Sequence, residues 1–572
     1  MNKIKSLYDL WCKRATDKAI LDELNAIKGD DEAILDRFYR ELDFGTAGLR
    51  GVIGAGTNRM NIYTVGRATQ GFAEYILTVA KNKSVAIGYD SRINSDVFSK
   101  TAATVFAANG IKVWLYPVLV PTPMLSFAVR ELGCDAGVVV TASHNPSKYN
   151  GYKAYGPDGC QLNTEASKEV LGYVEKVDTF DGVKKLDFDE AVKSGMIEFI
   201  GNDVFEKYYE NVMAQSVNPE ILKSAGLKII YTALNGSGNI PVRTVLGRMG
   251  VNDITIVPEQ ELPDGNFPTA PYPNPEIREA FTLALDLAKK VEPDILLATD
   301  PDCDRVGIAV RDGDDYTLMS GNEVGAVMLY YLLSQRTEKS TMPTNPLMVK
   351  TIVTSRICDK IAADFGCEVI DILTGFKYIG EQIGILEAKG EENRYIMGFE
   401  ESYGYLVGSY VRDKDAVIGS LMICEMAAFF KNQNKTLIDV LNELYEKYGV
   451  FMHKQMSFAF EGAEGMKIMA DTMASLRTNP PKEIAGMAVT KVCDYETRIA
   501  TLTESGKSEA INLPKSNVLA YTLSGGAEAI VRPSGTEPKI KIYLTATADS
   551  VENADNLMNK LEKAAKPLLG IN

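Results

Sequence analysis

The sequence has few of the residues on which several common chemistries depend. It contains only two histidines, His144 and His453, so an HExxH metalloprotease site and multi-histidine metal sites are excluded. The eight cysteines form no CxxC pair, which argues against a zinc site and against a disulfide framework. No run of about 18 apolar residues occurs, and the first residues lack the apolar core of a secretion signal. We therefore expect a reduced, cytoplasmic protein without a membrane span.

Charge and length indicate a large, acidic, folded protein. Lys and Arg number 61 against 76 Asp and Glu, which gives a net charge of -15. This balance argues against nucleic acid as a partner, and any anionic substrate must meet a local cluster of basic residues. The 572 residues, of which 45% are hydrophobic and 24% charged, predict roughly three to five domains.

Short apolar runs that end in polar, glycine-containing loops recur along the chain. They lie at 84–92, 136–146, 227–238, 294–305 and 395–405. Helical stretches such as 97–110 and 322–335 lie between them, and this alternation predicts α/β domains with parallel or mixed sheets. Ligands of such sheets bind beyond the carboxyl ends of strands, so we expect several of these loops to meet at one cleft. After residue 483, strand-like segments precede one helix at 550–569, which predicts a small α+β domain.

The loop Thr141-Ala-Ser143-His144-Asn145-Pro146 places a serine among strong hydrogen-bonding side chains. A serine nucleophile needs activation or a very good electrophile, and no second histidine is near in sequence to build a hydrolase triad. A phosphoryl group is an electrophile that fits. The alternative is a turn rich in Ser, Asn and Pro that caps a strand.

Three alternating carboxylates, Asp300, Asp302 and Asp304, follow the apolar strand 294–298. A tight loop can turn all three inward, and three hard oxygen ligands suit Mg²⁺. An EF-hand would need Gly and Glu where Arg305 and Arg311 stand. A solvated acidic turn is the other alternative, but carboxylates packed together repel one another unless a cation compensates. The pattern therefore favours a metal site.

Two further loops are rich in groups that bind phosphates or sugars. In 529–541, the guanidinium of Arg532 can form a bidentate pair of hydrogen bonds with a phosphate. Further hydrogen bonds can come from Ser534, Gly535 and Thr536. A hairpin with incidental basic residues is the alternative there. In 398–405, carboxylates and a hydroxyl stand beside aromatic residues, a mixture that suits sugar hydroxyls but is also common in solvent loops.

Taken in order, TASHNP, DPDCDR, FEES and RPSGTEPK resemble the four signature loops of the α-D-phosphohexomutases, the family of phosphoglucomutases and phosphomannomutases. The likeness runs from FGTAGLRG at 44–51 to the C-terminal domain. It implies four domains around a central cleft, three related α/β units and a smaller α+β one. We place them at 1–205, 206–318, 319–450 and 451–572, with an N-terminal helical extension in the first.

The resemblance also implies roles for single residues. Ser143 matches the serine that carries the transferable phosphoryl group, and Asp300, Asp302 and Asp304 match the Mg²⁺ ligands, with an oxygen of phospho-Ser143 completing the set. Arg305 and Arg50 would neutralise phosphoryl charge. Contacts with the sugar and with the non-transferring phosphate would come from Glu400, Ser402, Arg532, Ser534, Gly535 and Thr536.

The implied reaction moves a phosphoryl group from phospho-Ser143 to a sugar monophosphate, which becomes a bisphosphate. The bisphosphate then returns its other phosphoryl group to Ser143. A bisphosphate such as glucose 1,6-bisphosphate is therefore the intermediate and the activator. Candidates for general acid/base are Lys153, Lys377 in TGFKYIG, and His144; a lysine would need a lowered pKa. The usual sugar loop GEMSGH is altered here, since Tyr403 intervenes and Tyr405 stands where a histidine is frequent, so the loop does not decide the sugar. Glucose phosphate is the expected substrate, ahead of pentose and mannose phosphates.

Two alternatives from other classes remain. A DxD-type phosphatase of the haloacid dehalogenase kind would leave the serine loop unexplained. A silent, metal-binding relative would have lost the nucleophile, whereas Ser143 is present. Small-molecule sugar phosphates are the expected partners, and the sequence leaves monomer and dimer open.

Overall fold

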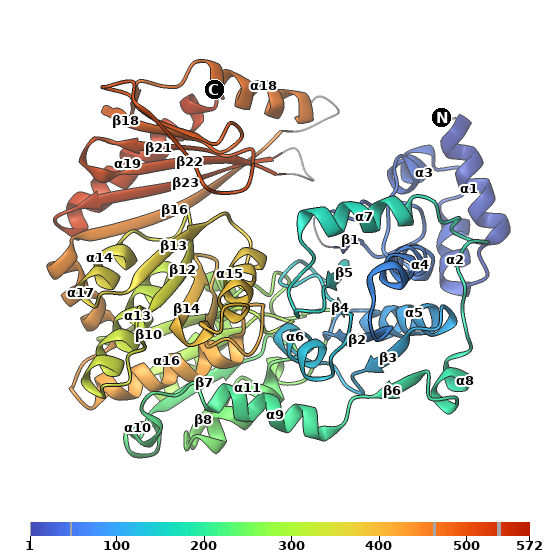
Figure 1. Ribbon diagram of the computed structural model, residues 1–572, viewed down its shortest axis with the longest axis horizontal. Helices are drawn as coiled ribbons and strands as arrows, with labels where there is room; N and C mark the ends of the chain where they lie inside the picture. The colour runs from blue at the N-terminus through green and yellow to red at the C-terminus, as the bar shows by residue number, and fades with distance from the viewer. Residues whose placement is uncertain (1, 46–47, 461–464, 535–538, 572) are drawn as a thin grey trace. The chain divides into compact units, whose positions relative to one another are not determined.

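The computed structural model describes residues 2–45, 48–460, 465–534 and 539–571 (Figure 1). The chain forms two compact units. The first comprises residues 1–321, 379–398 and 402–434, and the second comprises 322–378, 399–401 and 435–572. Among the helices of the described ranges, none has both the length and the apolar character that a bilayer crossing requires.

Short helices at the N-terminus pack on the first α/β domain. Asp17 and Asp30 cap two of them by accepting hydrogen bonds from backbone amides three residues further on. Trp11 is fully buried, with its ring edge-on to Phe38 and to Tyr63 of the following helix. The extension therefore shares a hydrophobic core with that domain. These helices are α1 (Asn2–Arg14), α2 (Lys18–Ala26) and α3 (Asp31–Phe38).

The first sheet has the order β1-β5-β4-β2-β3-β6. Strands β2, β3, β4 and β6 are parallel, whereas β5 runs antiparallel to β4 and β1 antiparallel to β5. Strand β4 is buried along its whole length, as its AGVVV sequence requires for a central strand. The strands are β1 (Gly48–Val52), β2 (Ser84–Tyr89), β3 (Lys112–Leu115), β4 (Ala136–Val140), β5 (Tyr149–Tyr155) and β6 (Ile197–Phe199), and the helices are α4 (Ile62–Val79), α5 (Ser95–Ala108), α6 (Thr122–Glu131), α7 (Thr164–Val174) and α8 (Phe188–Lys193).

The second sheet has the order β11-β10-β9-β7-β8, with β8, β7 and β9 parallel, β10 antiparallel to β9, and the edge strand β11 antiparallel to β10. Strand β9 is completely buried and delivers the acidic loop at its carboxyl end. The strands are β7 (Lys228–Thr232), β8 (Asp253–Ile256), β9 (Ile295–Thr299), β10 (Val306–Asp312) and β11 (Asp315–Met319), and the helices are α9 (Asn202–Met213), α10 (Pro219–Ser224), η1 (Pro258–Gln260), α11 (Asn239–Arg248), η2 (Arg278–Phe281) and α12 (Thr282–Val291).

A third sheet has the order β13-β12-β14-β15, in which β12 and β13 are parallel. Strand β14 is buried throughout and ends at Glu400, where the predicted sugar loop begins. The strands are β12 (Leu347–Thr351), β13 (Glu368–Ile372), β14 (Tyr395–Glu400) and β15 (Gly404–Val407), and the helices are α13 (Gly321–Glu338), α14 (Ile357–Asp364), α15 (Lys377–Glu387), η3 (Glu392–Arg394), α16 (Ala416–Lys431) and α17 (Leu437–Tyr448).

The C-terminal sheet is antiparallel, with the order β16-β23-β22-β21-β18-β19-β20 and β17 paired to β18. Its core includes Met473, Leu544 and Leu561, so helices α18 and α19 share one apolar layer with the strands. The elements are β16 (Val450–Ala459), α18 (Gly465–Thr478), β17 (Glu483–Ile484), β18 (Met487–Asp494), β19 (Ile499–Leu502), β20 (Ser508–Ala510), β21 (Leu519–Leu523), η4 (Ser524–Gly526), β22 (Glu528–Pro533), β23 (Lys539–Ala548) and α19 (Val551–Leu568).

The sequence prediction of α/β domains with mixed sheets and a C-terminal α+β domain is confirmed by these sheets. The helix predicted at 550–569 is α19, and Ser550 caps it by accepting a hydrogen bond from the amide of Asn553. The four domain boundaries stay predictions.

His453 is a half-buried histidine of the C-terminal sheet. It lies on β16 opposite Thr545 of β23, and its Nδ1 is 3.1 Å from the hydroxyl of that threonine. Its Nε2 is buried and has no hydrogen-bond partner in the described part of the chain. Burial, with a contribution from the positive charge of Lys350, lowers the pKa of His453 to about 3.

This lowered pKa should make folding stability depend on pH. In the unfolded chain a histidine has a pKa of about 6.5, so acid favours unfolding as soon as the pH falls below that value. Between pH 7 and pH 5, His453 should cost about 2 kcal/mol of the free energy of unfolding. His453→Gln should make the decline shallower by that amount in urea unfolding at several pH values. The exposed neighbour Lys454→Gln is the control, and equal slopes for wild type and His453→Gln would contradict the prediction.

Candidate active site

The serine loop begins at the carboxyl end of β4. Ser143 is buried and adopts a left-handed backbone conformation with φ of 52°, which is uncommon for a residue with a side chain. The amide of Ser143 donates to the hydroxyl of Thr141 at 2.8 Å. The Ser143 hydroxyl lies 2.9 Å from Oδ2 of Asp300 and 3.2 Å from Nδ1 of His144. The serine is therefore held at a strained turn with its oxygen against a carboxylate.

Arg92 clamps this loop from the side of β2. Its guanidinium is fully buried and donates to the carbonyl oxygens of Pro146 and Tyr149, each at 3.0 Å. It also donates to the carbonyls of Ser143 and Asn145. One rigid planar group thus satisfies several loop carbonyls together, which fixes the turn that presents the serine.

The acidic loop lies at the carboxyl end of β9. Asp300, Asp302 and Asp304 are all fully buried, and each offers a carboxylate oxygen within 4.8 Å of the others. Cys303 turns the loop with φ of 48°. Oδ1 of Asp300 accepts hydrogen bonds from the amides of Asp304 and Arg305 at 3.1 and 3.0 Å. The alternation predicted from sequence therefore does turn all three carboxylates inward.

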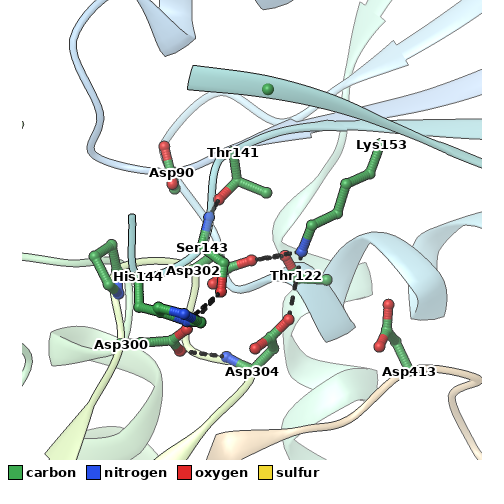
Figure 2. A network of polar contacts seen from close by, with 12 residues as sticks. Asp90, Thr122, Thr141, Ser143, His144, Lys153, Asp300, Asp302, Asp304 and Asp413 are labelled. Carbon is green, nitrogen blue, oxygen red and sulfur yellow. Dashed lines mark hydrogen bonds and ion pairs between the residues drawn. The ribbon is translucent and has the colours of Figure 1, made fainter. Parts of the chain in front are cut away.

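Two lysines approach these carboxylates, and Figure 2 shows the first of them, Lys153. Lys153 on β5 places its Nζ 2.8 Å from Oδ2 of Asp302 and 3.4 Å from Oδ2 of Asp304. Lys414 places its Nζ 2.8 Å from Oδ2 of Asp304 and 3.3 Å from Oδ1 of Asp413. A Cβ on Gly404 would come within 2.4 Å of the Lys414 side chain, so glycine is required there for the lysine stem to pass.

The remaining oxygens of two aspartates fit a cation. Oδ1 of Asp302 and Oδ1 of Asp304 are buried, and neither has a hydrogen-bond partner in the described residues. The Nε of Arg305 is 3.6 Å from Oδ1 of Asp304, beyond hydrogen-bonding distance. Buried, unbonded carboxylate oxygens are costly unless a charge compensates them. The donor set of hard oxygens is the one that Mg²⁺ or a similar divalent ion prefers, so the residues fit a metal site.

Burial and neighbouring charges shift the pKa values of these groups in opposite directions. Burial, together with the charges of Asp302 and Asp304, raises the pKa of Asp300 well above its ordinary value. Burial alone would also raise the pKa of Asp302, but Lys153 and Lys414 lower it. The cluster therefore combines carboxylates with very different proton affinities.

Lys153 and His144 differ in charge state at neutral pH. Burial alone would lower the pKa of Lys153, but Asp302 and Asp304 outweigh it and raise the pKa. Lys153 therefore does not have the lowered pKa that a proton-accepting lysine would need while it contacts these two carboxylates. Burial, with the positive charges of Arg305 and Arg50, lowers the pKa of His144 well below its usual value. His144 is neutral at pH 7.

The other cationic residues predicted for the site lie in the same unit. Arg305 donates to Glu276 at 3.1 Å and begins the turn into β10. Arg50 is exposed on β1, opposite Gly151 of β5. Ser402 lies in this unit as well and is half-buried. The structure thus brings Ser143, His144, Lys153 and the three aspartates together, with two arginines contributing to the potential at His144.

The remaining predicted residues belong to the second unit. Glu400 is buried at the end of β14 and accepts a hydrogen bond from the amide of Gly375 at 2.8 Å. Lys377 begins α15, two residues after that glycine, with its Nζ 5.2 Å from the ring centroid of Tyr378. Arg532 lies on β22 opposite Lys541, and the amide of Ser534 donates to the carbonyl of Lys539. Gly535 and Thr536 lie outside the described residues.

The last residue of the segment 398–405 lies in the sheet and not in the loop. Tyr405, which stands where a histidine is frequent in the family, is fully buried in β15 and donates its hydroxyl to the carbonyl of Gly321 at 3.3 Å. Its ring belongs to the core because β15 continues the buried sheet directly after the loop.

Sequence reasoning missed four residues of this site: Arg92, Thr122, Asp413 and Lys414. Two of them stand in the run Arg412-Asp-Lys-Asp415, whose alternating charges precede the apolar helix α16. Charged residues next to such a helix are rarely buried without a reason, and this signal could have found Lys414. Thr122 carried no comparable signal.

Comparison with known proteins assigns the family. Residues 41–181, 206–313 and 320–448 match three consecutive descriptions, which read "Phosphoglucomutase/phosphomannomutase, alpha/beta/alpha domain I", "domain II" and "domain III". The matches begin after the N-terminal helices and include the serine loop, the acidic loop and the sugar loop.

Individual relatives agree with this. The chain is similar to a phosphoglucomutase of Staphylococcus haemolyticus, with 38% identity over 517 residues, 90% of this chain and 92% of that protein. A phosphoglucomutase of Staphylococcus aureus is 35% identical over 560 residues, which cover 97% of this chain and 98% of that protein. The crystal structure of a Paramecium phosphoglucomutase, parafusin, in its open form shares the fold, with a TM-score of 0.68 and 16% identity over 93% of this chain and 96% of that one. The chain belongs to the phosphoglucomutase/phosphomannomutase family, the α-D-phosphohexomutases.

Proposed function

We propose that the chain is a phosphoglucomutase that interconverts α-D-glucose 1-phosphate and glucose 6-phosphate. The observation that carries this proposal is a buried serine at a strained turn, hydrogen-bonded to one of three clustered aspartates. The name shared by relatives at 35% to 38% identity over nearly the whole chain supports glucose as the sugar. Pentose and mannose phosphates are the alternatives that the specificity experiment below separates.

The reaction consists of two phosphoryl transfers. In the first, the bond from phosphorus to Oγ of phospho-Ser143 breaks while a free sugar hydroxyl forms a new bond to the same phosphorus and loses its proton. The product is glucose 1,6-bisphosphate. In the second, the other phosphoryl group of this intermediate returns to Ser143, so the enzyme is regenerated without net hydrolysis. Such transfers depend on in-line positioning and on neutralising the charge of the phosphoryl oxygens.

Residues of the serine loop prepare the nucleophile. Arg92 and Thr141 fix the turn, so Ser143 does not need to order itself during the reaction. Neutral His144 lies within hydrogen-bonding distance of the Ser143 hydroxyl and orients it. Lys153 is our choice as the group that exchanges a proton with the substrate hydroxyl, because it is the candidate lysine that lies in the serine unit. With its raised pKa it holds a proton that it can donate, and it can accept one only when its contacts with Asp302 and Asp304 are released.

Asp300, Asp302 and Asp304 would hold Mg²⁺, together with an oxygen of phospho-Ser143. When bound, a divalent cation in this position supplies electrostatic neutralisation of the transferring phosphoryl group. Arg305 and Arg50 would add positive charge on the protein side. Glu400 and Ser402 would bind sugar hydroxyls, and Arg532, Ser534, Gly535 and Thr536 would bind the phosphate that is not transferred.

Removing the nucleophile should abolish turnover. Ser143→Ala deletes one buried oxygen and leaves the loop contacts of Arg92 in place, so the fold should persist while mutase activity falls by at least about a thousandfold. Intact-mass analysis after incubation with glucose 1,6-bisphosphate should show one phosphoryl adduct on wild type and none on the variant. Ser508→Ala, at an exposed serine, is the matched control. An adduct on Ser143→Ala would show that another residue carries the phosphoryl group.

Removing one charge from the acidic loop should weaken metal binding. Asp302→Asn keeps the shape of the side chain but lowers the negative charge, so Mg²⁺ affinity by calorimetry should fall at least about tenfold. Chelation of divalent ions should likewise stop the wild-type enzyme. Asp286→Asn, at an exposed aspartate paired with Lys289, is the control. Equal Mg²⁺ affinities of wild type and Asp302→Asn would refute the ligand assignment.

Substitutions in the sugar loop and in the phosphate loop should have different effects on the kinetics. Arg532→Ala removes a charge-assisted fork for the phosphate of every substrate, so KM should rise by comparable factors for glucose, mannose and pentose phosphates. Glu400→Gln keeps an oxygen that can accept from Gly375 but loses the charge, so it should change the ratio of kcat/KM among the three. Steady-state kinetics at saturating Mg²⁺ measure both. Equal losses on all three for Glu400→Gln would remove it from sugar recognition.

A further inference from the structure

Thr122 contacts the acidic loop from a different segment of the chain. It is the first residue of α6 and is fully buried. Its hydroxyl donates to Oδ2 of Asp302 at 2.9 Å, and its backbone amide donates to the main-chain carbonyl of the same aspartate at 2.8 Å. Figure 2 shows the threonine directly beside the Asp302 carboxylate. One residue of the first sheet domain therefore holds one aspartate of the second at two points.

This double contact restricts the carboxylate of Asp302. The carbonyl bond fixes the backbone of the loop, and the hydroxyl bond then fixes the rotation of the side chain. With Oδ2 occupied, Oδ1 is the oxygen that is left, buried and without a hydrogen-bond partner in the described chain. The threonine, together with Lys153 at 2.8 Å from the same Oδ2, thus determines which oxygen of Asp302 is available to a cation.

Asp304 is held by different chemistry. Its Oδ2 contacts the ammonium groups of Lys153 and Lys414, and Oδ1 is again the oxygen without a hydrogen bond. The lysines are positively charged and oppose the binding of a divalent cation nearby. Asp302 also has Lys153 at 2.8 Å from its Oδ2, but its second partner is the neutral Thr122 hydroxyl and not another ammonium group. The hydrogen bond from Thr122 adds no positive charge and does not depend on the contact between Lys153 and the same oxygen.

We propose that Thr122 is a positioning residue of the metal site: its hydroxyl holds Oδ2 of Asp302, so that Oδ1 faces the cation whether or not Lys153 remains in contact. The inference rests on the proposed function, in which Asp300, Asp302 and Asp304 bind the metal. Groups that orient metal ligands from outside commonly contribute about 10- to 100-fold to metal affinity.

The test compares Thr122→Val, which keeps the branched shape, with Thr122→Ser, which keeps the hydroxyl. Calorimetric titration of the full-length, dephosphorylated protein with Mg²⁺ should show affinity reduced about tenfold or more for Thr122→Val and within about twofold of wild type for Thr122→Ser. Thr69→Val is the matched control, because Thr69 is also buried but donates only to a backbone carbonyl within α4.

Kinetics separate positioning from a merely structural role. For Thr122→Val, kcat should recover as Mg²⁺ is raised to saturation, and KM for the sugar phosphate at saturating Mg²⁺ should match that of wild type. A structural defect would instead lower kcat at every Mg²⁺ concentration. Thermal unfolding without metal should be nearly the same for Thr122→Val and Thr69→Val.

Several outcomes would overturn the inference. Wild-type Mg²⁺ affinity in Thr122→Val would do so, and so would equally weak binding by Thr122→Ser, because then the shape and not the hydroxyl matters. If Thr122→Val does not fold, Thr122→Ala against Thr122→Ser decides the same question. If the wild-type protein itself does not bind Mg²⁺, the proposed metal site is refuted, and the inference about Thr122 is refuted with it. If wild type binds Mg²⁺ and only the Thr122 variants behave unexpectedly, the inference fails while the metal site stands.

Discussion

The burial of three carboxylates within 4.8 Å of one another is the constraint on which the rest of the site depends. Charged groups this close repel strongly in a medium of low polarisability, and hydrogen bonds alone do not remove the repulsion. Two ammonium groups from different segments, those of Lys153 and Lys414, compensate part of this charge. Among the described residues, Oδ1 of Asp302 and Oδ1 of Asp304 have no hydrogen-bond partner. Segments far apart in the sequence must therefore meet at one loop, and the fold of the first unit is the arrangement that allows it.

The nucleophile depends on the same loop. Ser143 is buried at a left-handed turn, and such a conformation persists only where the surroundings impose it. Arg92 imposes it through the loop carbonyls, and Asp300 through the serine hydroxyl. Because Asp300 also accepts from two amides of its own loop, the positions of the serine and of the acidic cluster are linked.

The sequence allowed the strand-end loops to be predicted because the strands before them are wholly apolar, as in β4 and β9. It could not show the partners that approach from distant segments, since Thr122 and Lys414 meet Asp302 and Asp304 only through tertiary packing. It also could not show where the loop after Glu400 ends, since the buried sheet resumes at Gly404 and takes Tyr405 into the core. The raised pKa of Lys153 was likewise beyond sequence reasoning, since it depends on the distance to Asp302.

The order of these segments along the chain has a consequence for biosynthesis. The acidic loop leaves the ribosome after Thr122 and Lys153, which can contact it at once, but well before Lys414. Domains of large proteins fold as units while the chain is still being made. During that interval Asp304 has Lys153 but not Lys414 as an ammonium partner. The charge balance of the acidic loop is therefore completed only by a segment that is synthesised much later.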